Sequence, residues 1–137
     1  MTNYRNYAYY LATNQVDYDV FASSYYPYWH GSLENLSEVL TKINKNYGKE
    51  VMIAETSYAY TTENSDFWNN TISSDTQASK PYAYSVEGQM QFLRDLTKTA
   101  AEIPNCIGIF YWEGTWISVG QHSMQENQIL WERYGSG

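Results

Sequence analysis

Two acidic residues lie just after apolar segments of the kind that form buried strands. Glu55 directly follows residues 51–54, and the hydroxyl-bearing residues 56–58 come next. Glu113 lies close behind a second apolar segment, 107–111. In enzymes built on parallel strands, the catalytic groups project from the carboxyl ends of those strands. The pattern therefore predicts that both segments contribute to one active-site rim.

The composition indicates a neutral, sugar-like ligand. Fifteen tyrosines and five tryptophans bring the aromatic content to 18%, against 17% charged residues, so many rings must lie at or near the surface. An aromatic ring covers the apolar face of a pyranose while neighbouring polar groups bind its hydroxyls. The net charge of −7 argues against nucleic acid or an anionic membrane as a partner.

Strand and helix patterns alternate along the chain. Strands are predicted within 16–25 and over 51–54 and 107–111. Between the first two, Ser32 is suited to cap a helix that runs to Tyr47 and stops at Gly48. A strand–helix–strand–helix–strand order predicts an α/β fold with a parallel sheet.

A second helix is predicted to begin after Ser85 and to end before Pro104. Its predicted buried face consists of Val86, Met90, Leu93, Leu96 and Ala100. The polar segment 57–84 lies between Glu55 and this helix and has no strand or helix pattern of its own. Long segments of this kind in compact domains tend to be functional, so it is expected to lie over the active site.

Three segments together resemble glycoside hydrolase family 53, the arabinogalactan endo-β-1,4-galactanases. They are residues 21–31 (FASSYYPYWHG), 54–58 (AETSY) and 110–117 (FYWEGTWI). They look like the last three strand ends of that family, in order and at suitable spacing. The resemblance implies a (β/α)8 TIM barrel, of which this chain supplies roughly strands six to eight. It also implies a hydrolase that cleaves β-1,4-galactan of type I arabinogalactan with retention of anomeric configuration.

The same resemblance assigns roles to individual residues. Glu55 matches the nucleophile at the end of the seventh strand. Tyr26 lies on the sixth-strand loop, where a ring hydrogen-bonds the nucleophile or the sugar, and Trp112 matches the platform beneath the sugar at the cleavage point. The residues carried over as lining the substrate groove are Trp29, His30, Tyr58, Glu113 and Trp116.

The chain departs from the family in its second carboxylate. A retaining glycosidase needs two carboxyl groups about 5–5.5 Å apart. The family places its proton donor in an Asn-Glu pair after the fourth strand, and this dipeptide does not occur in the 137 residues. A complete barrel takes about 250 residues. Residues 1–137 are therefore interpreted as the C-terminal part of one barrel domain, lacking strands one to five, and the isolated chain is expected to be inactive.

Two other readings stay open. The chain could be a non-catalytic galactan-binding or inactive remnant that keeps Trp29, Trp112 and Trp116 without a proton donor. It could also belong to another retaining β-glycosidase of the same clan, although the loop 24–30 favours the galactanases. A reading frame that continues upstream of Met1 into a strand ending in Asn-Glu would distinguish a catalytic barrel from a remnant.

No cofactor or metal is expected. In bacterial relatives the loop after the seventh strand can bind calcium, and the corresponding stretch here is 63–70. Phe67 and Trp68 replace small or ligating residues, so a solvated polar loop is the expectation. Cys106 is the single cysteine and is expected to be packed. The first residues lack a secretion signal, yet an enzyme that degrades polymeric galactan would work in the extracellular space or at the cell surface.

Three parallel strands without their neighbours leave two open sheet edges. The side chains expected to face the barrel interior are Val20, Ala22, Met52, Ile53, Ile107 and Ile109. These would lose the strands that cover them. Self-association, or dependence on a missing N-terminal part, is therefore expected of the isolated chain.

Overall fold

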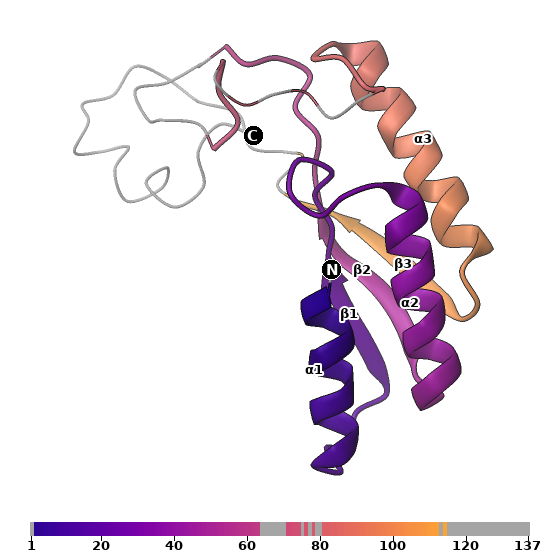
Figure 1. Cartoon of the computed structure of the whole chain (residues 1–137). Coiled ribbons are helices and arrows are strands. Elements are labelled where there is room, and N and C mark those ends of the chain that lie inside the picture. The colour runs from indigo at the N-terminus through magenta and orange to yellow at the C-terminus, as the bar shows by residue number, and fades with distance from the viewer. Residues whose placement is uncertain are drawn as a thin grey trace.

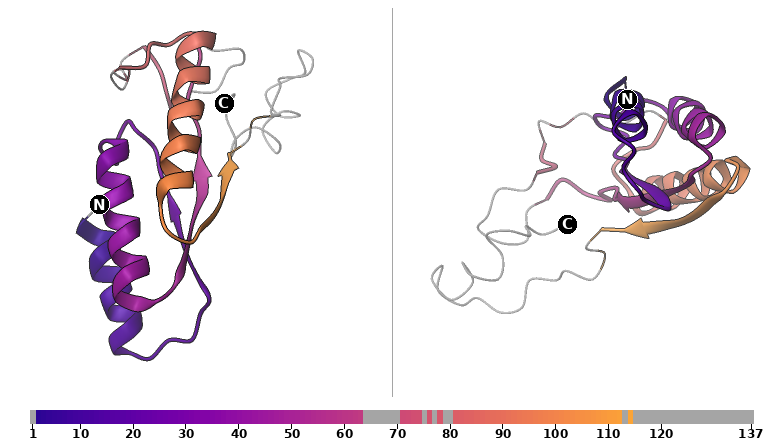
Figure 2. Two further views of the ribbon diagram at one scale, coloured as in Figure 1. Left: turned by 90° about the vertical axis from the view of Figure 1, so that its right-hand side faces the viewer. Right: turned by 90° about the horizontal axis from the view of Figure 1, so that it is seen from below.

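The computed structural model describes residues 2–63, 71–74, 76, 78, 81–112 and 114. Its three parallel strands are β1 (Val20–Ser24), β2 (Glu50–Thr56) and β3 (Cys106–Tyr111), in the sheet order β1-β2-β3. The helices are α1 (Thr2–Thr13), α2 (Leu33–Tyr47) and α3 (Val86–Glu102). All three helices cover the same face of the sheet (Figure 1, Figure 2).

The helix boundaries follow the predicted capping chemistry. Ser32 accepts a hydrogen bond from the backbone N–H of Asn35 at 3.3 Å, so its side chain caps α2. Gly48 ends α2 in the left-handed region, with φ of 65°, as a residue without a Cβ does readily. Ser85 caps α3 by accepting from the N–H of Gly88 at 3.0 Å. The predictions for Ser32, Gly48 and Ser85 are confirmed.

The core lies between the helices and the sheet. From α2 it receives Leu36, Val39, Leu40 and Ile43, and from α3 Gly88, Phe92, Leu96 and Ala100. The predicted burial of Val86 and Met90 on α3 is wrong, because both side chains are exposed. Apolar residues cover more than half of the circumference of α3, and the arc that meets the sheet is the one containing Phe92 and Leu96.

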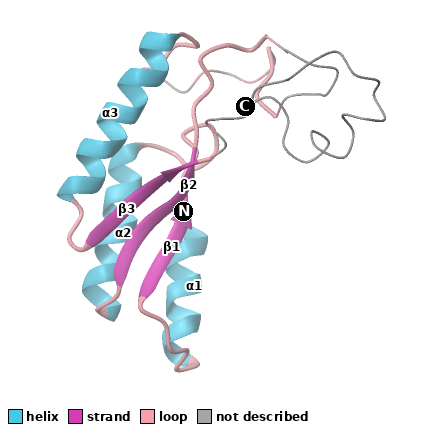
Figure 3. Ribbon diagram, turned by 180° about the vertical axis from the view of Figure 1, so that it is seen from behind, coloured by secondary structure: helices cyan, strands magenta, loops and turns pink. Residues whose placement is uncertain are grey.

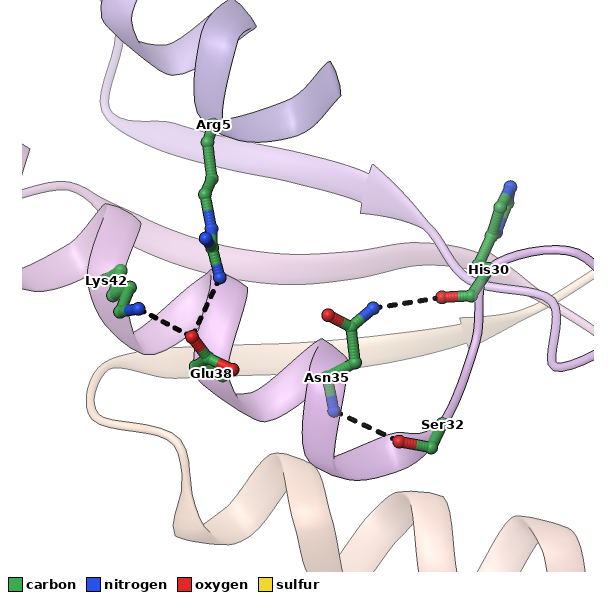
Figure 4. Close-up of polar contacts among 6 residues, drawn as sticks. All are labelled: Arg5, His30, Ser32, Asn35, Glu38 and Lys42. Carbon is green, nitrogen blue, oxygen red and sulfur yellow. Dashed lines mark hydrogen bonds and ion pairs between the residues drawn. The ribbon is translucent and has the colours of Figure 1, made fainter. Parts of the chain in front are cut away.

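Polar contacts fix α1 against the rest of the layer. The Tyr4 hydroxyl donates to the carbonyl of Ser24 at 2.9 Å, which joins α1 to the end of β1. Arg5 of α1 binds the Glu38 carboxylate of α2 at 2.9 Å and so links the two helices, while Lys42 binds the same carboxylate at 2.5 Å within α2 (Figure 4). These ion pairs are exposed, so their contribution to stability is small.

No described helix covers the opposite face of the sheet, which turns toward the viewer in Figure 3. Ala22 and Ile107 are exposed there, as predicted for side chains that face a barrel interior. The same prediction is wrong for Ile53, which is fully buried beneath the helices, and for Ile109, which packs against the core. Ile53 lies on the same face as the buried Val51, because side chains alternate along β2, so Met52 and Ile53 cannot both face the barrel interior. Between Val51 and Ile53 the register advances two residues in β2 but three in β3, and this extra residue in β3 moves Ile109 off the face that carries Ile107.

Among the described residues the sheet has one helix-covered face, one bare face and two unpaired edges, as a segment of a (β/α)8 barrel has. The structure therefore agrees with the predicted partial TIM barrel of three strands with their helices. The bare face corresponds to the barrel interior. The carboxyl ends of β1, β2 and β3 form the rim, and Glu55, Tyr26 and Trp112 lie at or just after them.

Candidate active site

Glu55 lies one residue before the end of β2, at a break in the regular strand pairing. Between Ser23 and Ser24 the register advances one residue in β1 but two in β2, so Ala54 is an extra residue. Strict alternation would place Glu55 on the helix-covered face that holds Ile53. A bulge reorients the side chain that follows it. Glu55 is accordingly half-buried at the rim instead of being enclosed in the core.

Tyr26 contacts the Glu55 carboxylate directly. Its hydroxyl donates a hydrogen bond of 2.6 Å to Oε1 of Glu55. Hydrogen bonds to an ionised oxygen are shorter and stronger than neutral ones. The backbone supports this contact, because the N–H of Tyr25 donates to the carbonyl of Glu55 at 2.8 Å. The loop after β1 is thus joined to the end of β2 by both main chain and side chain.

His30 closes the loop that carries Tyr26. Its Nδ1 accepts a hydrogen bond of 2.9 Å from the backbone N–H of Tyr26. The backbone N–H of His30 donates to the carbonyl of Tyr26, also at 2.9 Å. Burial lowers the pKa of His30 below its ordinary value, and the nearby Glu55 carboxylate opposes that shift in part. His30 was predicted to line the substrate groove, but one of its two ring nitrogens is occupied within the loop.

Two exposed indole rings flank the carboxylate. Trp29 is 54% exposed, and its ring centroid lies 5.5 Å from that of Tyr26. On the other side of β2, Trp112 is 47% exposed and its backbone N–H donates to the carbonyl of Thr56 at 2.8 Å. Because β2 lies between β1 and β3, Glu55 lies between the elements that carry the two tryptophans. Exposed aromatic faces can stack on a sugar ring while the neighbouring carboxylate reacts with it.

The predicted role of Tyr58 in substrate binding is wrong. Tyr58 is only 1% exposed, and its hydroxyl donates to the carbonyl of Tyr82 at 2.8 Å. Its ring stacks on Tyr28 with centroids 5.1 Å apart and planes 11° from parallel. A buried ring with these partners has no face left for a sugar. Tyr58 instead anchors the segment after β2 to the protein core.

Two residues that were not predicted as site residues hold this segment from the other side. The hydroxyl of Tyr111, the last residue of β3, donates to the carbonyl of Tyr58 at 3.1 Å and accepts from its N–H at 3.3 Å. Gln89 of α3 donates to the same carbonyl at 2.5 Å. Tyr111 ends a strand at the predicted rim, which was a usable signal. Gln89 is a polar residue on a helix, and the sequence carried no signal that it would contact this segment.

Some predicted site residues lie outside the part of the chain that the structure describes. These are Glu113 and Trp116, together with residues 64–70 of the stretch considered for calcium. Within the described ranges, no group of three or more His, Cys, Asp or Glu side chains could hold a metal ion. The described helices include none that is long and apolar enough to cross a membrane.

Comparison with known proteins places this rim in a family. The chain is 50% identical over 129 residues to the endo-beta-1,4-galactanase of Bacillus subtilis, a match that covers 93% of this chain and 30% of that protein. It is 34% identical over 119 residues to the arabinogalactan endo-beta-1,4-galactanase of Cellvibrio japonicus, covering 85% of this chain and 31% of that protein. The chain thus spans about a third of the length of these relatives.

A solved structure agrees with the sequence relatives. The catalytic domain of the family 53 protein of Ignisphaera aggregans superimposes with a TM-score of 0.76 at 38% identity, covering 83% of this chain and 32% of that one. The three strands and their helices are therefore part of a TIM barrel. The model of glycosyl hydrolase family 53 matches residues 1–135. With that match over nearly its whole length, the chain belongs to glycosyl hydrolase family 53.

Proposed function

We propose that the protein containing these residues is a retaining endo-β-1,4-galactanase that acts on type I arabinogalactan, with Glu55 as its nucleophile. The observation that carries the proposal is the 2.6 Å hydrogen bond from Tyr26 to Glu55 at a rim with exposed Trp29 and Trp112. The names of the Bacillus and Cellvibrio relatives support β-1,4-galactan as the substrate.

The proposed chemistry has two displacement steps. In the first, an oxygen of Glu55 attacks the anomeric carbon, the bond to the leaving oxygen breaks, and a proton donor protonates that oxygen. In the second, water loses a proton to the same acid/base residue and attacks the anomeric carbon, which releases Glu55 as a carboxylate. The acid/base residue is not among these 137 residues. It would be supplied by an Asn-Glu pair on an earlier strand of the barrel.

Glu55 is suited to the nucleophilic role because a neighbouring hydroxyl orients its carboxylate. The Tyr26 hydroxyl binds one carboxylate oxygen, and Oε2 has no hydrogen bond among those described. The bulge at Ala54 and the hydrogen bond from the Tyr111 hydroxyl to the carbonyl of Tyr58 limit how far the end of β2 can move.

The sugar would stack on exposed aromatic rings. We assign Trp112 to the platform at the cleavage point and Trp29 to the groove on the opposite side of Glu55. Glu113 and Trp116 are proposed to line the same groove, by resemblance alone. Since galactan is a polymer, the complete protein would act outside the cell.

The decisive experiment traps the covalent intermediate in the natural polypeptide that contains these residues. An activated 2-deoxy-2-fluoro-β-galactoside should form a stable ester, because the fluorine slows the second displacement. Intact mass and peptide sequencing should locate the label on Glu55. Glu55→Gln should prevent labelling and abolish release of reducing ends from β-1,4-galactan. Glu50→Gln, at the exposed opposite end of β2, is the matched control and should label normally.

A non-catalytic galactan-binding protein is the second candidate, because the exposed rings of Trp29 and Trp112 suit sugar binding without any proton donor. This candidate predicts binding of galacto-oligosaccharides without labelling and without hydrolysis. Labelling at a residue other than Glu55 would overturn the assignment of the nucleophile. The 137-residue chain by itself should not hydrolyse galactan, and activity that depends on Glu55 in that chain would contradict the need for an upstream acid/base.

A further inference from the structure

The loop residue that binds Glu55 is held at both of its main-chain groups by a single histidine. The N–H of Tyr26 donates to Nδ1 of His30, and the carbonyl of Tyr26 accepts from the N–H of His30, each at 2.9 Å. A second backbone N–H, from Trp29, reaches the same carbonyl at 3.1 Å. Tyr26 therefore has little freedom to rotate its backbone while these bonds persist.

His30 is itself fixed from α2. The side-chain amide of Asn35 donates to the carbonyl of His30 at 3.3 Å, and the capping residue Ser32 holds the backbone of Asn35 (Figure 4). In the same view the imidazole ring points away from α2. The chain of contacts thus runs from the helix cap through His30 to Tyr26 and ends at the Glu55 carboxylate.

We propose that His30 is a positioning residue for the reaction at Glu55, acting through Tyr26 and only in its neutral form. A backbone N–H can only donate, so Nδ1 must carry no proton and the ring proton must lie on Nε2. An imidazolium has a proton on both nitrogens and cannot accept the Tyr26 bond. Protonation would therefore release the backbone of Tyr26 and loosen its hydroxyl from Glu55. The proposal rests on the function proposed above for Glu55.

The surroundings of the imidazole favour the neutral form. Among the described residues, the titratable groups that face it are Tyr4 from α1, Tyr25 and Tyr26 from its own loop, and Glu55 from β2. The rings of Tyr4 and Tyr25 lie 6.5 and 6.4 Å from the imidazole, and burial raises the pKa of Tyr25. Partial burial disfavours the charged ring. Of these groups, Glu55 favours the charged ring.

A double-mutant cycle in the natural polypeptide tests the route through Tyr26. His30→Ala should lower kcat on galactan by about tenfold, with little change in KM. This is the loss expected when the hydrogen bond from Tyr26 to the Glu55 carboxylate is weakened. In a Tyr26→Phe background the same substitution should cause no further loss in kcat, because the group that His30 positions is already gone. His30→Asn should restore most of the activity lost in His30→Ala, since its side-chain oxygen can accept where Nδ1 does.

The pH profile separates positioning from a general structural role. In the wild type, kcat should fall on the acid side as His30 gains a proton, and this limb should be absent from His30→Asn. Losses in kcat that add fully in the double mutant would overturn the proposal. So would a His30→Asn variant as impaired as His30→Ala.

A second measurement is independent of activity. Nitrogen-15 NMR of ring-labelled histidine, with the His30 signals assigned from their loss in His30→Asn, should show an unprotonated Nδ1 and a protonated Nε2 at neutral pH. A protonated Nδ1, or rapid exchange between tautomers, would overturn the proposal even in an active enzyme. The expected tautomer in a protein that does not cleave galactan would support the positioning geometry while the proposed galactanase function fails.

Discussion

The hydroxyl of Tyr26 lies 2.6 Å from Oε1 of Glu55, although 29 residues separate them along the chain. Two local features bring them together. The extra residue Ala54 in β2 turns Glu55 away from the helix-covered face, and the turn closed by His30 aims Tyr26 at it. Both features lie at the carboxyl ends of parallel strands, where barrel enzymes carry their chemistry.

Removing the Tyr26 hydroxyl should impair chemistry more than binding. In the natural polypeptide, Tyr26→Phe keeps the ring and deletes the donor to Glu55, so kcat on galactan should fall by about ten- to a hundredfold, the worth of a hydrogen bond to a charged group. Steady-state kinetics with soluble galactan measures this. Tyr10→Phe, whose ring is exposed on α1, is the matched control and should leave kcat unchanged. An unaltered kcat in Tyr26→Phe would remove Tyr26 from the mechanism.

The elements of the fold were predictable because their signals are local. Ser32, Gly48 and Ser85 mark helix ends through hydrogen bonds and a backbone conformation that depend on neighbouring residues alone. The three apolar segments predicted as strands likewise form β1, β2 and β3. In contrast, the face of α3 that packs on the sheet depends on where the sheet lies. The sequence pattern alone therefore predicted burial of Val86 and Met90, which are exposed.

The site was predictable only in part. Glu55, Tyr26, Trp29 and Trp112 come together at one rim, but the direction of each side chain depends on pairing between strands. The bulge at Ala54 arises from the register of β2 against β1, which no single segment encodes. Tyr58 follows Glu55 closely and was expected to line the groove, yet tertiary packing on Tyr28 buries it. Glu113 and Trp116 stay predictions from the sequence.

Gly88 should be intolerant of any side chain. A Cβ at this position would lie 2.0 Å from the carbonyl oxygen of Ala83, a backbone atom that cannot move without shifting the start of α3. Gly88→Ala should lower the free energy of unfolding by about 1–3 kcal/mol, as overpacking typically does. Urea unfolding of the chain followed by circular dichroism measures the change. Gly108→Ala in β3 is the control, because its Cβ would meet only a ring carbon of Phe110 at 3.9 Å.

A side chain at position 48 should have enough room, but the backbone conformation there should disfavour it. No atom lies within 4 Å of a Cβ built there, yet its φ of 65° is strained for residues with a side chain. Gly48→Ala should therefore cost about 1–2 kcal/mol in unfolding free energy from backbone conformation alone. Gly48→Asn should cost less, because asparagine enters the left-handed region more readily. Equal losses in the two variants would show that the cost has another origin.

The pKa of His30 predicts a stability that depends on pH. Burial lowers this pKa in the folded chain below the ordinary value of 6.5, so the unfolded chain binds the proton more readily. The contribution is fully present above the unfolded pKa and is lost as the pH falls through the lowered, folded pKa. Urea unfolding between about pH 5 and pH 8 should show a decline toward acid. His30→Asn should remove the part of the decline that lies just below the ordinary histidine pKa, and an unchanged profile would contradict the assignment.

The bare face of the sheet predicts self-association of the 137-residue chain. In the part of the chain that the structure describes, no strand pairs with the outer edge of β1 or of β3, and on β3 Ile107 is 50% and Phe110 60% exposed. Open edges with apolar side chains pair readily with further strands. Sedimentation velocity should show a weight-average mass that rises with concentration. Ile107→Lys, which places a charge on that edge strand, should shift the distribution toward monomer. Val86→Lys, at an exposed position on α3, adds the same charge away from the sheet and should leave the distribution as it is. A sharp monomer peak at low and high concentration alike would mean that the chain tolerates its missing neighbours without help from a second copy.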